Sequence, residues 1–153
     1  MSSHTARVLW QRQPDEAFTD KKYSRRHTWI FDGGLEIPAS PSPQVVPLPY
    51  SAEENVDPEE AYIASLSSCH MLFFLDLMSR EGFAVDSYED EAVGEMTRLE
   101  KGRHWVSKVT LNPKVAYHGA APSPELEADI HHRAHDLCFI ANSVKTEIVT
   151  VLG

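Results

Sequence analysis

The fold is decided by one stretch of sequence, residues 57–75, which reads DPEEAYIASLSSCHMLFFL. Asp57 is placed to cap a helix, and the fixed backbone angle of Pro58 suits the first helical turn. Apolar side chains then recur around most of the helical circumference, which is typical of a central, fully packed helix. We expect this helix to run to about Arg80 and to stop at Gly82, because glycine readily ends a helix.

Alternation of apolar and polar residues predicts strands on both sides of this helix. We expect strands over residues 5–13, 23–31 and from 35 onward before it, and over residues 84–99, 103–117 and 146–152 after it. Asp32-Gly33-Gly34 supplies a tight hairpin turn, and Lys101-Gly102 joins the two long strands. The last segment alternates like an edge strand.

A second helix is predicted after Pro122-Ser123-Pro124, where Ser123 is the expected cap. Its apolar residues repeat at helical spacing from Leu126 to Ala141, and Cys138 lies on or beside this stripe. The elements therefore follow the order of three strands, a long helix, two strands, a helix and a strand. This order predicts an α+β fold in which two main helices pack on antiparallel sheet, within a single domain over residues 1–153.

The composition limits the partners that the chain can have. A formal charge of −9 over 153 residues argues against nucleic acid or an anionic membrane surface as the main partner. The most apolar run, residues 61–78, is interrupted by three serines, a histidine and Asp76. We therefore interpret it as a helix buried in a soluble core or in a dimer interface, not as a membrane span. No apolar targeting segment follows Met1, and we expect a cytoplasmic protein.

Cys69 and Cys138 are the only cysteines, one in each predicted helix. Two cysteines are too few for a disulfide scaffold. Free cysteine often behaves as a small buried apolar residue, so both could be inert parts of the core. A reactive thiol instead needs a nearby cation or a helix N-terminus, since burial alone raises the pKa of a thiol. The residues alone leave both interpretations open.

Three histidines of the second helix raise a metal hypothesis. His131 and His135 are four residues apart on one helical face, but only Asp136 offers a carboxylate at a matching position. No paired motif recurs elsewhere in the sequence. We therefore expect these histidines, His132 included, to be solvated, with no metal site. The acidic run over residues 86–95 is interpreted in the same way, as a solvated strand and turn.

Three motifs carry a resemblance to a known family. They are Asp57-Pro58-Glu59, Ser68-Cys69 on the same helix, and Ala134-His135-Asp136-Leu137-Cys138 on the second helix. In order, spacing and type of element the chain resembles the OsmC/Ohr family of osmotically inducible and organic-hydroperoxide-resistance proteins, over about residues 23–152. The resemblance implies an OsmC-like α+β fold that forms an intertwined homodimer, with the long central helices buried between the subunits.

The resemblance also implies a thiol-dependent peroxidase that reduces organic hydroperoxides, of alkyl or fatty-acid type, to alcohols. Cys69 would be the peroxidatic thiol, which becomes a sulfenic acid, and Cys138 the resolving thiol, which closes a Cys69–Cys138 disulfide. A dithiol reductant of the dihydrolipoyl type would reopen that disulfide, and no bound cofactor or metal is implied. Apolar neighbours of both cysteines, such as Phe73 and Phe139, suit the organic part of such a substrate.

Family members also hold an arginine beside the thiolate through the glutamate of the Pro-Glu motif, which is Glu59 here. A guanidinium at about 4–6 Å favours the thiolate form of a cysteine. The arginine lies on the strand before the hairpin, so the resemblance points to Arg25 or Arg26. Residues two apart share a face of a strand, and this parity relative to Asp32 favours Arg26, with Arg25 as the alternative.

Two positions next to the cysteines depart from the family pattern. His70 follows Cys69 where an apolar or small residue is expected, and Phe139-Ile140 follow Cys138 where peroxidase members often carry Pro-Tyr. These differences leave a second interpretation open: a non-enzymatic OsmC-like dimer that binds a small molecule, or a thiol redox sensor with slow peroxide turnover. The deciding property is whether the two cysteines are close enough to bond, with Cα atoms within about 7 Å.

Overall fold

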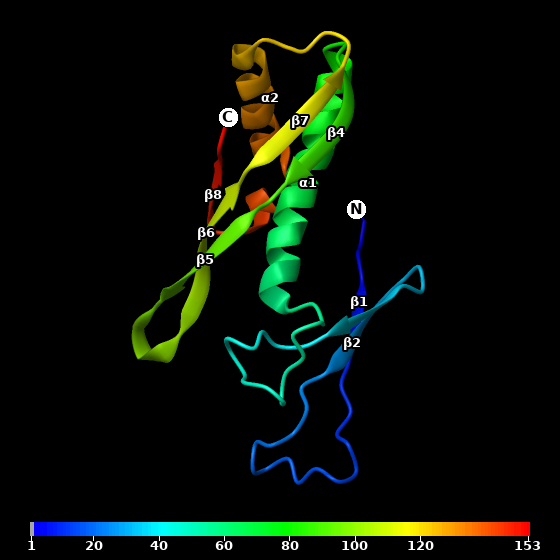
Figure 1. The fold of residues 1–153 in the computed structure, drawn as a ribbon, viewed down its shortest axis with the longest axis vertical. Coiled ribbons are helices and arrows are strands. Elements are labelled where there is room, and N and C mark those ends of the chain that lie inside the picture. The colour runs from blue at the N-terminus through cyan, green and yellow to red at the C-terminus, as the bar shows by residue number, and fades with distance from the viewer. Residues whose placement is uncertain (1) are drawn as a thin grey trace. The chain divides into compact units, whose positions relative to one another are not determined.

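The computed structural model describes residues 2–153, which form two compact units (Figure 1). The first unit ends at Ala61, and the second is Tyr62–Gly153. Each unit has its own strands. Whether the two units act as the single domain expected for residues 1–153 stays a prediction.

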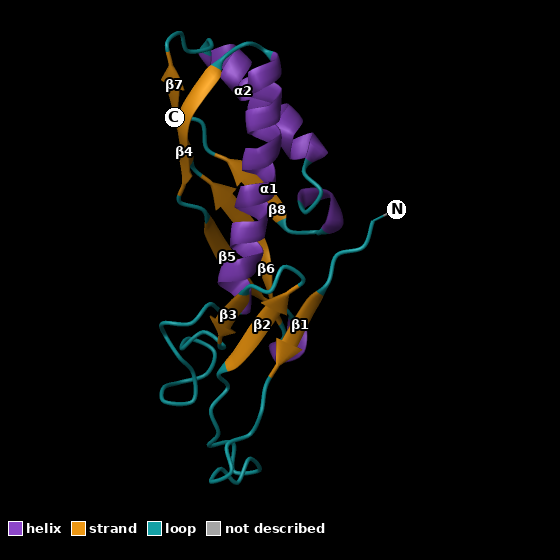
Figure 2. Cartoon of the chain, turned by 90° about the vertical axis from the view of Figure 1, so that its right-hand side faces the viewer, coloured by secondary structure: helices purple, strands orange, loops and turns teal. Residues whose placement is uncertain are grey.

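The first unit is built on an antiparallel sheet of β1 (Ala6–Leu9), β2 (His27–Phe31) and β3 (Glu36–Ala39), in that order (Figure 2). The hairpin between β2 and β3 is confirmed: the Gly34 N–H donates to the Phe31 carbonyl at 2.9 Å, and Gly34 has a φ of 89°, which glycine tolerates. β1 and β2 are shorter than predicted because residues 10–26 form a loop. The Trp10 indole donates to the Ser24 carbonyl at 2.9 Å across this loop, in place of strand pairing.

The predicted central helix is confirmed as α1 (Pro58–Arg80). Its start is a reciprocal capping box. Asp57 Oδ1 accepts from the Glu60 N–H at 2.8 Å, and Glu60 Oε2 accepts from the Asp57 N–H at 3.3 Å. Its end at Gly82, which has a φ of 86°, also agrees with the sequence. Local signals at both ends therefore define this helix.

The prediction that α1 is packed on all sides is wrong for the single chain. Its buried residues form one stripe, Leu66, His70, Phe74, Leu77 and Met78. Leu72 is 60% exposed, because the sheets and the second helix cover only one face of α1. By length and composition alone α1 could also cross a membrane, but its buried stripe packs on strands and on a second helix, as a core helix does.

The second unit contains two sheets. The first pairs β4 (Ala84–Asp90) with β7 (Pro113–His118), and the second contains β5 (Val93–Arg98), β6 (His104–Leu111) and β8 (Glu147–Thr150) in that order. β4 and β7 are antiparallel, as are β5 and β6. β8 lies at the edge of its sheet, as predicted, and runs parallel to β6.

Asp90 explains why the two long predicted strands, residues 84–99 and 103–117, are each divided near the middle. Its Oδ1 accepts from the Asn112 N–H at 2.6 Å, and its Oδ2 accepts from the Ser67 hydroxyl of α1. A side chain therefore replaces strand pairing at the point where both strands break. Asp90 is half-buried and hydrogen-bonded, which corrects the expectation that the whole acidic run is solvated.

The second helix is confirmed as α2 (Pro124–Leu137). Ser123 caps it, because its Oγ accepts from the Leu126 N–H at 3.1 Å. The helix ends earlier than its apolar stripe suggested. Cys138 has an extended backbone, with φ −61° and ψ 115°, and a separate short turn of 3-10 helix follows at Ala141–Ser143. Cys138 is therefore the residue that ends α2, not a residue within it.

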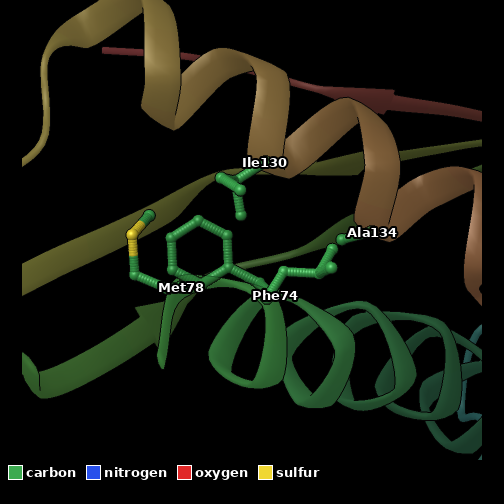
Figure 3. Packing of buried hydrophobic residues seen from close by; sticks show 5 residues of the cluster. Phe74, Met78, Ile130 and Ala134 are labelled. Atoms are coloured by element: carbon green, nitrogen blue, oxygen red, sulfur yellow. The ribbon is translucent and has the colours of Figure 1, made fainter. Parts of the chain in front are cut away.

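The main core of the second unit lies between α1 and α2, which run antiparallel (Figure 1). Phe74 and Met78 of α1 face Ile130 and Ala134 of α2 (Figure 3). Half-buried residues of β4 and β7 pack against this cluster. The packing holds the C-terminal third of α1 against α2, and Cys138 lies where α2 ends.

Candidate active site

The fold brings the two cysteines of the chain together. Cys69 is half-buried on α1, and Cys138 is buried, with 1% of its surface exposed. Both thiols are free, and Cys69 lies close enough to Cys138 to raise the pKa of the Cys138 thiol. Two residues far apart in sequence are therefore neighbours. The residues alone could not establish this contact, because it depends on how α1 packs against α2.

The surroundings of Cys138 favour its protonated form. Burial raises the pKa of the Cys138 thiol, and the Ala141 N–H lowers it by donating to Sγ at 3.4 Å. The neighbouring Cys69 thiol raises the pKa of Cys138 further. A protonated thiol is a poor nucleophile, which disfavours a first attack on a peroxide, whereas a sulfenic acid on the neighbouring Cys69 would form next to this buried thiol. Cys138 is therefore better suited to a resolving role than to the first attack.

An apolar cavity of about 230 Å³ opens beside Cys69. It is lined by Cys69, Leu72, Phe73, Asp76 and Phe139. The Phe73 and Phe139 rings meet edge to face, with centroids 5.0 Å apart. Asp76 is paired with Arg80 at 2.9 Å. Cys69 therefore faces a space with aromatic walls, whereas Cys138 is buried and is not among the residues that line this cavity.

The two candidate arginines lie in the first unit and have different partners. Arg26 is exposed and forms an ion pair with Glu54 at 2.8 Å. Arg25 is half-buried, with its guanidinium carbon 3.7 Å from the centroid of the Tyr23 ring. Its Nη1 also donates to the carbonyls of Lys21 and Tyr23, at 2.9 and 2.6 Å. Arg25 is therefore fixed in place, whereas Arg26 is held by one surface ion pair.

A second apolar cavity, of about 500 Å³, lies within the first unit. Its lining consists of Val8, Trp10, Phe18, Tyr23, Arg25, His27, Pro41 and Pro58. Arg25 thus shares a cavity with the proline that precedes Glu59. Over residues 2–153 no arginine lies within ion-pair distance of Glu59, which is half-buried. The arginine–glutamate pair implied by the resemblance stays a prediction.

The sequence did not predict the buried pair of histidines, His70 of α1 and His131 of α2. His70 Nε2 and His131 Nδ1 are 2.9 Å apart, and the two side chains belong to residues that are 1% and 3% exposed. The expectation of a solvated His131 is wrong, because it follows Ile130 on the buried side of α2. His132 is exposed, as expected, and His135 is half-buried. Over residues 2–153 no cluster of three or more histidine, cysteine or acidic side chains could hold a metal ion.

Burial also determines the protonation of these two histidines. It lowers the pKa of His70 and that of His131 to about 4, and the nearby His131 and His135 lower that of His70 further. Asp90 raises both values but does not compensate for burial. Both imidazoles are therefore neutral at neutral pH. One ring donates the hydrogen bond and the other accepts it.

Comparison with known proteins identifies relatives of the chain. The family model described as OsmC-like protein matches residues 51–152. An OsmC-like protein of unknown function from Vibrio cholerae is 54% identical over 99% of each chain, with a TM-score of 0.95. An organic hydroperoxide resistance protein from Elizabethkingia anophelis is 16% identical over 98% of this chain and 93% of its own, with a TM-score of 0.71. A Legionella pneumophila organic hydroperoxide resistance protein, OsmC, is 13% identical over 98% and 96%, with a TM-score of 0.64. None of the curated proteins matches.

Proposed function

Because the chain belongs to the family of OsmC-like proteins, we propose that it is a thiol-dependent peroxidase that reduces organic hydroperoxides to alcohols. The observation that carries this proposal is the contact between the Cys69 and Cys138 thiols, beside an apolar cavity that Cys69 lines. The distant relatives named as organic hydroperoxide resistance proteins share the fold. They support the proposal at the level of the family.

The proposed reaction has two steps in the protein. The Cys69 thiolate attacks the O–O bond, takes one oxygen as a sulfenic acid, and the other oxygen leaves with a proton as an alcohol. The Cys138 thiol then attacks the sulfenic sulfur, which forms a disulfide and releases water. We assign the first attack to Cys69 because it lines the cavity, whereas Cys138 is buried and its pKa is raised.

An external dithiol, of the dihydrolipoyl type, would reduce the disulfide by thiol exchange. A cytoplasmic location, where thiols are kept reduced, is part of this proposal. The aromatic walls formed by Phe73 and Phe139 fit the alkyl or aryl part of a hydroperoxide better than hydrogen peroxide. The protein itself then needs no bound cofactor for the peroxide chemistry.

A second copy of the chain would complete the site. Leu72 and Phe139 are 60% and 71% exposed beside Cys69, and large apolar side chains left open in this way are typical of an interface. We propose a homodimer in which this face of α1 is covered and an arginine held by Glu59 approaches Cys69. Of the two candidates, Arg25 is favoured by the structure because it is fixed and shares a cavity with Pro58.

The test is the intact mass of the reduced protein after one equivalent of cumene hydroperoxide. A loss of about 2 Da that is absent in Cys69→Ser and Cys138→Ser is expected from a fast disulfide-forming reaction. In Cys138→Ser, a gain of about 16 Da on Cys69 identifies the attacking thiol. No change in mass within minutes rejects the peroxidase. A disulfide that forms once but is not turned over with excess peroxide and dithiol indicates a redox sensor instead.

A further inference from the structure

The buried histidine pair links the two helices that carry the cysteines. His70 follows Cys69 on α1, and His131 lies on α2, about two helical turns before the end of the helix at Cys138. The ring planes of His70 and His131 are nearly parallel, at 5°, with centroids 5.2 Å apart, and their nitrogens are 2.9 Å apart. This is the geometry of a direct hydrogen bond between α1 and α2.

The bond has little freedom to adjust. Phe74 stacks on the His131 ring at a centroid distance of 4.2 Å, so the ring cannot easily tilt. Over residues 2–153, His70 Nδ1 is buried without a hydrogen-bond partner. A buried N–H without a partner is costlier than a bare ring nitrogen, so we assign the proton to His70 Nε2, which donates to His131 Nδ1. Among residues 2–153, the contact with His131 is then the one hydrogen bond made by the His70 ring.

From this placement we infer that His70 and His131 are positioning residues, whose hydrogen bond holds Cys69 against Cys138 for disulfide formation. This inference rests on the proposed two-cysteine reaction. α1 and α2 otherwise meet mainly through apolar side chains, which resist separation but not small sliding of one helix along the other. The ion pair of Arg133 with Glu81, at 3.5 Å, lies beyond the C-terminal end of α1, is partly exposed and is far along the helix from Cys69. A directional bond next to Cys69 resists such sliding.

The two chemical steps depend on this bond to different extents. Attack on the peroxide needs Cys69, the activating arginine and the substrate, and it depends less on the exact position of α2 because no atom of α2 takes part in the bond changes. Disulfide formation needs the two sulfurs to approach to about 2.05 Å in a narrow range of geometries. A displacement of about 1 Å can slow a reaction between positioned groups by about 100-fold. The pair should therefore control the second step and leave the first nearly unchanged.

The experiment separates the two steps by rapid quenching and intact mass, using cumene hydroperoxide. In His131→Leu we expect formation of the Cys69–Cys138 disulfide to slow by about tenfold or more. Oxidation of Cys69 should stay within about twofold of the unchanged protein. The unresolved sulfenic acid should then gain a second oxygen, which appears as a species about 32 Da heavier. His132→Leu, at an exposed position of the same helix, is the matched control.

A conservative pair of variants distinguishes positioning from a general effect on folding. The amide of asparagine reaches the position of His131 Nδ1, whereas that of glutamine reaches the position of Nε2. We therefore expect His131→Asn to restore fast disulfide formation and His131→Gln not to restore it. Equal rates in these two variants, or an unchanged rate in His131→Leu, overturn the inference. If the unchanged protein forms no disulfide at all, the proposed function itself fails, which is a separate result.

Discussion

Replacing the histidine pair by leucine, in H70L/H131L, is expected to remove much of the acid sensitivity of the second unit. Burial is the main reason that the pKa of each histidine falls from 6.5 to about 4 in the folded protein. In the unfolded chain both titrate near the ordinary value. Between these two values the unfolded state binds more protons than the folded state, so stability is lost as the pH falls from about 6.5 to about 4.

The size of the effect follows from the same values. One pKa unit corresponds to about 1.4 kcal/mol, so a shift from 6.5 to about 4 amounts to about 3 kcal/mol for one histidine at full effect. At about pH 5 roughly 2 kcal/mol per histidine should already be lost relative to pH 7.5. Domains of this size are stable by about 5–15 kcal/mol, so the change is large enough to measure.

The assay is urea unfolding followed by circular dichroism at the two pH values. The unchanged protein should lose more stability between pH 7.5 and 5 than H70L/H131L, by about 2 kcal/mol or more. Exchanging both partners for apolar side chains of similar size leaves no buried polar group unpaired, so the variant should fold. Asp90 and His135, the other titratable groups that act on the pair, are kept. Equal losses in the two proteins would refute the assignment of a neutral, buried pair.

Three further substitutions test other parts of the argument. Arg25→Ala should slow the oxidation of Cys69 by cumene hydroperoxide by about 100-fold, measured by stopped flow. Arg26→Ala, the control, should have little effect on this rate. A large effect of Arg26→Ala and a small effect of Arg25→Ala would assign the role to Arg26. Gly94→Ala places a Cβ 2.8 Å from Ile63 Cγ1, so it should lower the free energy of unfolding in urea by about 1–3 kcal/mol. Adding Ile63→Val should recover part of this loss, and no recovery would show that this contact is not its cause. Phe74→Ala, which empties the core between α1 and α2, should cost about 3–5 kcal/mol by the same measurement, and a loss below about 1 kcal/mol would contradict the packing.

The elements that the sequence predicted well are those defined by local signals. The capping residue Asp57 and the positive φ at Gly82 fix both ends of α1, and both are readable from neighbouring residues. The breaks in the long strands were missed, because they depend on Asp90 bonding to Asn112, far along the chain. The parallel pairing of β8 with β6 was missed for the same reason, since it is a long-range contact.

For the candidate site too, local motifs were predictable from the sequence and long-range contacts were not. The motifs identified Cys69 and Cys138, but their contact is a property of helix packing and not of spacing in the sequence. The sequence does not predict the burial of His131, because a position next to the apolar stripe of α2 does not show whether the side chain points into the core. The available sign of burial is that His131 directly follows the apolar Ile130, about two turns before Cys138. This sign indicates a buried histidine only when the position of its partner His70 is known.

The position of Cys138 just beyond the last turn of α2 has a consequence for the dynamics of the redox cycle. Once the histidine pair has aligned the two helices, we expect the small final movement that closes the disulfide to occur in the short connection after Leu137, and not in the helix itself. Regular helix would have to unwind to bring such a residue closer, whereas an extended residue followed by a single 3-10 turn can rotate about a few bonds. Amide hydrogen exchange in reduced and oxidised protein should therefore differ over residues 138–143 and stay the same through α2. The cycle could then run many times with the main body of the fold acting as a rigid support.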